Sequence, residues 1–270
     1  IVDIKKIFSI NDQVVWLTVW CTNKELLGND NLRLIYYLVK KIKKNLTIAT
    51  VGCNLHTYKI YKLLGFKSGQ LNHFYFINNK KKKFNLVNGV ALNKNLKSKN
   101  SLKLLKLDLK KNYFSILGLK KFEKDYKKDF EYFKKKYLDN KFLKYSFFFI
   151  KDEKFLRGFF ISREDKLLNS KCLRLIEYFG DQNKISNLTN DFQNLCAKRN
   201  YEYIDFYNYG IKKKIIISSG LKLKKISNKL IIPNYFNPFI KKNIKLRFAF
   251  YPPSEKMILF KGDCDQDRPN

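Results

Sequence analysis

The sequence is poor in several residues that mark particular classes of protein. Only seven of its 56 basic residues are arginine, the residue best suited to bidentate phosphate recognition. No apolar run approaches the roughly 20 residues that a membrane-spanning helix needs, and no signal peptide is visible. The five cysteines form no Cys-x-x-Cys pair, and the two histidines are far apart. We therefore expect a cytoplasmic protein with neither a disulfide framework nor a metal site.

The formal net charge of +33 comes almost entirely from lysine. A charge of this size is typical of proteins that bind nucleic acid or an anionic membrane surface. Here lysine is accompanied by abundant Asn, Ile, Phe and Tyr, and all five residues have AT-rich codons, so a genomic base bias explains the composition without selection for binding. Nucleic-acid binding is therefore not expected, although the lysines could help to hold a nucleotide-bearing cofactor.

The chain is long and apolar enough to fold around a substantial core. It has 270 residues, a hydrophobic fraction of 45%, 24 phenylalanines and 17 tyrosines. This composition excludes a mainly disordered chain. The length favours one large or two modest domains.

The most informative stretch follows a predicted buried strand at residues 46–53. Asn54 stands at the exit of that strand, and the next ten residues predict a short helix that carries Tyr58 and Tyr61 one turn apart. Gly65 is expected to end this helix, and residues 70–77 predict another strand. Together they form a strand, helix, strand unit with a polar residue where the first strand ends.

This stretch resembles the last conserved block of the GNAT superfamily of acyl-CoA N-acyltransferases, which often reads Asn-x-x-Ala-x-x-x-Tyr-x-x-x-Gly-Phe. Asn54, Tyr61, Gly65 and Phe66 match the pattern, and Thr57 replaces its usual Ala. The resemblance implies that the Asn54 side chain orients the thioester of the acyl donor. It also implies that Tyr61 protonates the departing thiolate, a step that a positioned phenol can perform.

The resemblance further implies an acyl-CoA, most simply acetyl-CoA, as co-substrate. Its pyrophosphate is expected at a loop before a helix over residues 32–44, where Gly28, Asn29 and Asn31 stand. Only Gly28 survives from the family's glycine-rich loop. A near-continuous apolar run at residues 14–21, which ends in Trp20 and Cys21, predicts a central strand. The resemblance implies that backbone N–H groups of this strand hold the thioester oxygen.

The order of predicted elements implies an α/β protein made of two GNAT-like domains, each with a central mixed sheet flanked by helices. Residues 1–92 correspond to the C-terminal part of one such domain, truncated at its N-terminus. Residues 93–270 correspond to a second, complete but degenerate domain. Its predicted strands and helices are residues 102–109, 115–137 (one amphipathic helix), 145–150, 155–162, 172–179, 185–199 (a helix capped by Ser186), 201–207, 212–218 and 245–250.

The predicted second domain lacks residues that the family pattern uses for catalysis and cofactor binding. Ile216 stands four residues before Gly220, where the pattern has Tyr, and residues 180–184 contain no glycine-rich loop. We expect this domain to supply one wall of an acceptor cleft.

Other polar residues leave alternatives open. His73 and Tyr75 could reach the cleft or be satisfied core positions. One of Glu177, Glu202 and Asp205 could act as a base for an amine, or each could simply pair with a lysine. A terminal run with alternate acids, Asp263, Asp265 and Asp267, could chelate a cation but more simply forms a turn.

The sequence therefore favours an N-acyltransferase that moves an acyl group from acyl-CoA to the amine of a small polar acceptor such as an amino sugar. The alternative is a catalytically inactive GNAT-like scaffold that binds a nucleotide or a protein partner. The oligomeric state is not predicted.

Overall fold

The computed structural model describes residues 14–17, 36, 39–40, 47–90, 103–107, 118–152, 155–186, 188–225, 229–236 and 238–265. The strands are β1 (Val14–Trp16), β2 (Thr47–Val51), β3 (Lys67–Gln70), β4 (Asn72–Ile77), β5 (Lys103–Leu107), β6 (Tyr145–Lys151), β7 (Leu156–Leu167), β8 (Ser170–Gly180), β9 (Tyr203–Tyr209), β10 (Lys222–Leu223), β11 (Tyr235–Phe236), β12 (Phe239–Ile240), β13 (Arg247–Tyr251) and β14 (Leu259–Phe260). The helices are α3 (Leu55–Leu63), α5 (Glu123–Tyr126), α6 (Phe130–Phe133), α7 (Thr189–Arg199) and α8 (Lys213–Ser218). Short 3-10 and π segments complete the described part.

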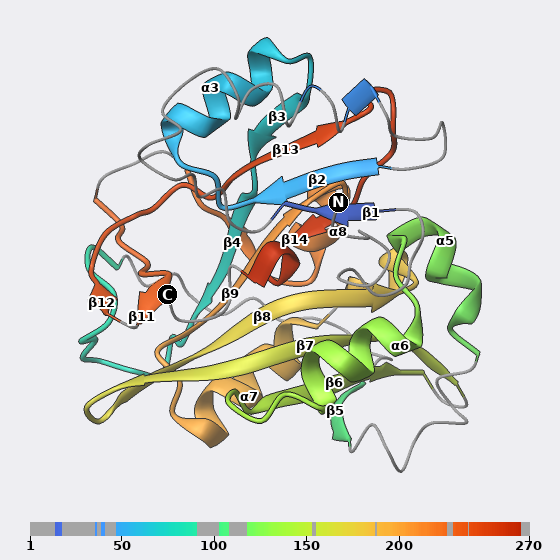
Figure 1. The fold of residues 1–270 in the computed structure, drawn as a ribbon. Helices are drawn as coiled ribbons and strands as arrows, with labels where there is room; N and C mark the ends of the chain where they lie inside the picture. Colours follow the sequence, from blue (N-terminus) through green and yellow to red (C-terminus); the bar gives the residue numbers. More distant parts are fainter. Residues whose placement is uncertain are drawn as a thin grey trace.

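A small sheet combines strands from both ends of the sequence. Its order is β1-β2-β13-β3, with β1 parallel to β2 and β13 antiparallel to both of its neighbours. Figure 1 shows this sheet beneath α3, with β13 in red between the blue and cyan strands. The first sheet is thus completed by a strand that is almost 200 residues distant from β2 in sequence.

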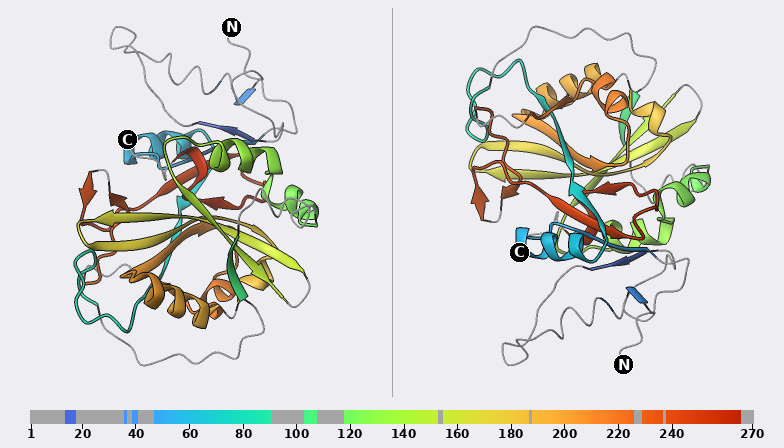
Figure 2. Two further views of the ribbon diagram at one scale, coloured as in Figure 1. Left: turned by 90° about the horizontal axis from the view of Figure 1, so that it is seen from below. Right: turned by 90° about the horizontal axis from the view of Figure 1, so that it is seen from above.

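The larger sheet has the order β10-β4-β9-β8-β7-β6-β5, and β14 pairs with β9 off this path. Strands β8 and β9 are parallel and are joined by α7, which makes a βαβ unit. Helices α7 and α8 cover one face of this sheet, whereas α5, α6 and the first sheet lie on the other (Figure 2).

The two sheets are physically continuous. The chain leaves β3 in the first sheet and, after the buried Leu71, enters β4 in the second sheet, where β4 pairs with β9 over its whole length. The largest cluster of buried side chains is dominated by phenylalanines of β6, β7 and β8. These strands read as apolar runs because both of their faces are covered.

The predicted α/β class, with mixed sheets flanked by helices, is confirmed. The helix after Asn54 is also confirmed: Gly65 has a φ of 79°, and Phe66 N–H donates to Tyr61 O at 3.0 Å, which closes the helix with a left-handed C-terminal turn. The division of the chain at residues 92 and 93 stays a prediction. No described helix is long and apolar enough to cross a membrane.

Two local predictions are wrong. Residues 115–137 do not form one helix in their described part, because Lys127 adopts a left-handed conformation (φ 52°) and separates α5 from α6. Ser186 does not cap α7: the helix begins after Leu188, and Ser186 Oγ donates to Asn183 O instead.

Candidate functional site

Asn54 lies where the chain leaves β2 and enters α3. Its backbone is extended (φ −67°, ψ 171°), and its Oδ1 accepts a hydrogen bond from Thr57 N–H at 2.9 Å. This is the geometry of a helix N-cap. The side chain is exposed at the carboxyl end of a buried strand, which is a common place for a binding site in α/β sheets.

Tyr61 faces the sheet from the last turn of α3. Its side chain is only 2% exposed and packs with Ile48, Ala249 and Phe66, whose ring centroid is 5.0 Å away. Burial raises the pKa of the phenol well above its usual value, and the thiols of Cys53 and Cys264 raise it further. The phenol therefore stays protonated at neutral pH, as a general acid must, but the same burial suits a packing residue.

Beside this helix the parallel strands β1 and β2 separate. They pair up to Trp16 and Ala49, and Leu17 N–H still donates to Ala49 O at 2.9 Å. Beyond this point, hydrogen bonds to side chains take the place of backbone hydrogen bonds between the two strands. Thr50 Oγ1 donates to Leu17 O at 2.8 Å, and Val51 N–H donates to the Cys264 thiol at 3.3 Å. The separation lies at the end of β2 that leads to Asn54.

The predicted cofactor-binding residues Trp20, Cys21, Gly28, Asn29 and Asn31 lie outside the described residues. Their roles stay predictions. Among the predicted site residues, the structure places only the catalytic pair, Asn54 and Tyr61, at the two ends of a two-turn stretch of α3.

A second strand separation occurs between β8 and β9, and the chain itself fills it. The two strands pair only up to Leu175 and Phe206. Beyond that point residues 259–262 lie between them: β14 pairs with β9, and Gly262 N–H donates to Ile176 O of β8 at 3.2 Å. A Cβ on Gly262 would lie 2.9 Å from Ile176, so this position accepts only glycine without a shift of its neighbours.

A buried ion cluster holds this segment in place. Lys128, Glu177 and Asp263 are each at most 1% exposed, and Lys128 Nζ contacts both carboxylates, with Asp263 at 2.7 Å. Burial alone would lower the pKa of Lys128, but the two carboxylates outweigh it and raise the pKa. The pKa of Glu177 is raised by burial and by Asp263, against the opposing effect of Lys128. Tyr137 donates a hydrogen bond to Glu177 from the other side.

The cluster was not predicted. Glu177 was an expected candidate base or lysine partner, and it is a lysine partner. Asp263 lies in a short 3-10 turn, Asp263–Asp265, as expected, but its complete burial was not predicted. Nothing in its local sequence distinguishes Lys128 from the many exposed lysines, because the contact joins residues 135 positions apart.

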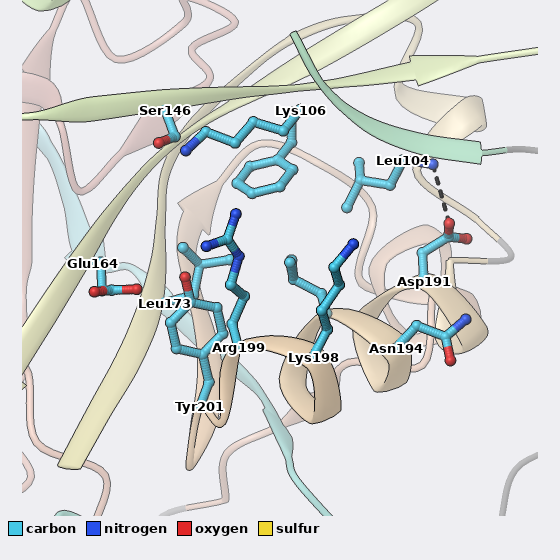
Figure 3. Close-up of a pocket in the computed structure, with 12 residues that line it drawn as sticks. Leu104, Lys106, Ser146, Glu164, Leu173, Asp191, Asn194, Lys198, Arg199 and Tyr201 are labelled. Atoms are coloured by element: carbon cyan, nitrogen blue, oxygen red, sulfur yellow. Dashed lines mark hydrogen bonds between the residues drawn. The ribbon is translucent and has the colours of Figure 1, made fainter. Parts of the chain in front are cut away.

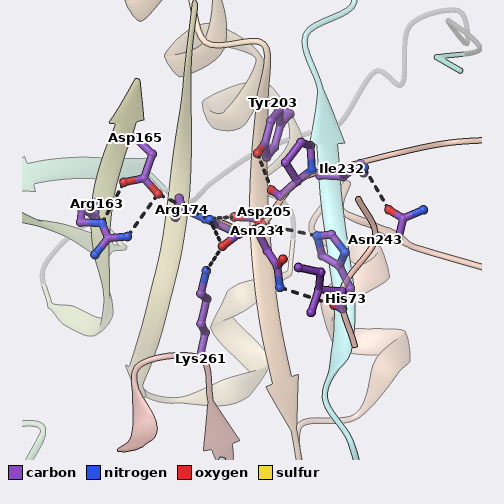
Figure 4. Close-up of polar contacts among 12 residues, drawn as sticks. His73, Arg163, Asp165, Arg174, Tyr203, Asp205, Ile232, Asn234, Asn243 and Lys261 are labelled. Atoms are coloured by element: carbon purple, nitrogen blue, oxygen red, sulfur yellow. Dashed lines mark hydrogen bonds and ion pairs between the residues drawn. The ribbon is translucent and has the colours of Figure 1, made fainter. Parts of the chain in front are cut away.

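A second buried network includes two of the other candidate residues, His73 and Asp205 (Figure 4). Arg174 donates to both carboxylate oxygens of Asp205, at 3.1 and 2.6 Å, and His73 Nε2 lies 3.4 Å from the same carboxylate. Burial lowers the pKa of His73 although Asp205 opposes the shift, so the imidazole is neutral. Glu202 accepts hydrogen bonds from two backbone N–H groups, of Asn85 and Leu86. Asp205 and Glu202 are therefore satisfied core residues, whereas His73 lies against Asp205 without a hydrogen bond of good geometry.

Lys261 points into the same network from the segment that fills the second separation (Figure 4). It is 3% exposed, and its Nζ donates to Asn234 O at 2.7 Å. Burial and the neighbouring charge of Arg174 lower its pKa to about 7, while Asp205 opposes the shift.

Comparison with solved structures identifies the fold. A probable N-acyltransferase from Enterococcus faecalis V583 superposes with a TM-score of 0.52 at 8% identity, over 87% of this chain and 53% of that chain. A GCN5-related N-acetyltransferase from Anabaena variabilis ATCC 29413 gives a TM-score of 0.46 at 11% identity, over 84% of this chain and 51% of that chain. The first of these superpositions shows that this chain shares the fold of a probable N-acyltransferase, in line with the fold expected from the residues around Asn54.

The chain spans about half the length of these two proteins. Comparisons with known protein families and with curated proteins gave no match. The activity of this chain is therefore inferred from its own residues.

Replacing Lys128 with Met should destabilise the protein by about 3–5 kcal/mol at neutral pH, because it leaves Glu177 and Asp263 buried without their cation. Urea unfolding would measure the loss. Lys124→Met is the matched control, since Lys124 is exposed on α5 one turn earlier, and it should change stability by less than about 0.5 kcal/mol. Equal effects of the two substitutions would show that the cluster does not stabilise the fold.

Replacing Lys261 with Met should stabilise the protein most below pH 7. The folded-state pKa of Lys261 is about 7, below the unfolded value of about 10.4. Below pH 7 folding therefore has to bury a charged ammonium group, and the free-energy cost of doing so has its full value. This penalty disappears as the pH rises from about 7 to 10.4, so the advantage of Met should shrink by about 1 kcal/mol per pH unit over that window.

Urea unfolding at pH 6.5 and pH 9.5 measures this difference. The exposed Lys256→Met serves as the control and should show no such pH dependence. A Lys261→Met advantage that is the same at both pH values would mean that Lys261 is charged in the folded protein.

Proposed function

We propose that the chain is an N-acyltransferase that moves an acyl group from an acyl-CoA to the amine of a small polar acceptor such as an amino sugar. Acetyl-CoA is the expected donor. The observation that carries the proposal is the position of Asn54 and Tyr61 on one helix at the carboxyl end of β2, beside the separation of two parallel strands.

The two strand separations differ in their fit to an acyl donor. Between β8 and β9, the backbone of residues 259–262 takes up hydrogen-bonding groups of both strands, and the buried Phe260 and Asp263 leave no room. Between β1 and β2, the described contacts beyond Ala49 are made by the side chains of Thr50 and Cys264. One acyl-CoA per chain, at the first separation, fits the described residues.

An acyl-CoA bound there would supply an activated thioester. Tyr61 would hold a proton for the departing thiolate, because burial keeps its phenol protonated. Asn54 would orient the thioester with its amide. Backbone N–H groups of the strand predicted over residues 14–21, which includes Trp20 and Cys21, would stabilise the negative charge that develops on the thioester oxygen. Gly28, Asn29 and Asn31 would contact the pyrophosphate.

The alternative is a catalytically inactive GNAT-like scaffold, and two observations favour it. Tyr61 is almost fully buried, and Asn54 already uses its amide oxygen as a helix cap. In that case both residues serve only the structure of α3. Substitutions that separate the structural role from the chemical one distinguish the two hypotheses.

Tyr61→Phe should lower the turnover number for acyl transfer by about 10²–10⁴-fold while leaving acetyl-CoA affinity within about threefold, because only the proton donor is lost. Release of free thiol from acetyl-CoA in the presence of a panel of amino sugars measures the rate. Tyr58→Phe, on the same helix one turn earlier, is the control and should retain activity. Equal activity of both variants would remove Tyr61 from the mechanism.

Asn54→Ser should keep the N-cap, since a serine hydroxyl accepts the same hydrogen bond, but should remove the amide that would orient the thioester. We expect unfolding free energy within about 0.5 kcal/mol of wild type and a clear loss of turnover. Asn54→Ala should lose both the N-cap hydrogen bond and the amide, and should lower the free energy of unfolding by about 1 kcal/mol. Wild-type turnover in Asn54→Ser would show that Asn54 is only a cap.

A further inference from the structure

A cavity of about 280 Å³ lies in the second sheet, on the face that α7 covers. It opens between the edge strand β5, its neighbour β6 and helix α7 (Figure 3). Phe148, Leu173 and Leu195 give it an apolar wall. It belongs to a different sheet from Asn54 and Tyr61 and is independent of the proposed acyl-transfer site.

Three cations line the cavity. Lys198 and Arg199 rise from the last turn of α7, and Lys106 lies on β5 across from them (Figure 3). None of the three makes an ion pair with another described residue, whereas the two carboxylates in the lining are engaged. Asp191 accepts the backbone N–H of Leu104 at 3.1 Å, and Glu164 pairs with Lys166 and Lys171 outside the cavity.

All three cationic residues are exposed, and they surround a space that one apolar wall borders. Like charges that the fold brings together around a concave, partly apolar space repel one another more strongly than charges spread over a convex surface. An anion between them would relieve the repulsion. The fork of N–H groups on Arg199 suits the two oxygens of a carboxylate or the oxygens of a phosphate.

We propose that this cavity is a binding site for a small organic anion with an apolar body, such as an aryl or alkyl carboxylate. The anionic group would lie between Lys106, Lys198 and Arg199, and the body would pack against Phe148 and Leu173. A volume near the lower limit for ligand pockets fits a molecule smaller than most cofactors.

Fluorescence titration with 2-naphthoate tests the site on the full chain. We expect saturable binding at one site, about tenfold or more tighter than for 2-naphthylmethanol, which lacks the charge, and for acetate, which lacks the apolar body. Equal affinity for acetate and 2-naphthoate would overturn the proposal in favour of non-specific attraction by the net charge, and so would the absence of saturable binding.

Variants locate the binding. The double substitution Lys198→Gln and Arg199→Gln should weaken binding of 2-naphthoate about tenfold or more. The control Lys134→Gln and Lys135→Gln makes the same charge change at exposed positions outside the cavity and should change it by less than about twofold. Leu195→Phe, which keeps every charge but fills the cavity, should also abolish binding. Equal loss in the control, or full binding in Leu195→Phe, would contradict the site.

Discussion

The contact of Lys128 with Glu177 and Asp263 is the interaction on which the arrangement of this protein depends. A lysine and two carboxylates are removed from water in the centre of the molecule, and each such burial is costly unless every charge has a partner. The cost is offset because Tyr137 donates to Glu177 and Phe260 N–H donates to Asp263. The requirement to bury Lys128 also explains why α5 and α6 are separate helices: the chain turns at Lys127 to bring Lys128 inward.

The same cluster holds the segment that fills the second strand separation. Asp263 anchors the segment that lies between β8 and β9, and the next residue, Cys264, reaches β2 at the base of the other separation. Residues 247–264 therefore complete the first sheet with β13, fill the opening in the second sheet, and then return to the first. The separation between β8 and β9 is thus occupied by the chain itself.

Local patterns in the sequence were sufficient to predict the parts of the fold that depend on neighbouring residues. The helix after Asn54 was predictable because its cap, its apolar face and Gly65 all lie within twelve positions. Long apolar runs gave β6, β7 and β8 within a few residues. The break at Lys127, the position of β13 and the burial of Asp263 were not predictable, because each depends on partners more than a hundred residues away. The candidate pair Asn54 and Tyr61 was predicted from the spacing of the motif. The burial of Lys261 and the cavity beside Arg199 depend on tertiary packing, which the motif does not describe.

Hydrogen–deuterium exchange, measured with and without acetyl-CoA, tests the central claim most directly, namely that the separation beside α3 takes the acyl donor while the one filled by residues 259–264 does not. The account predicts slower exchange in peptides that cover residues 47–65 and unchanged exchange in those that cover residues 176–180 and 259–264. Protection confined to the second set, or no protection in either, would contradict it.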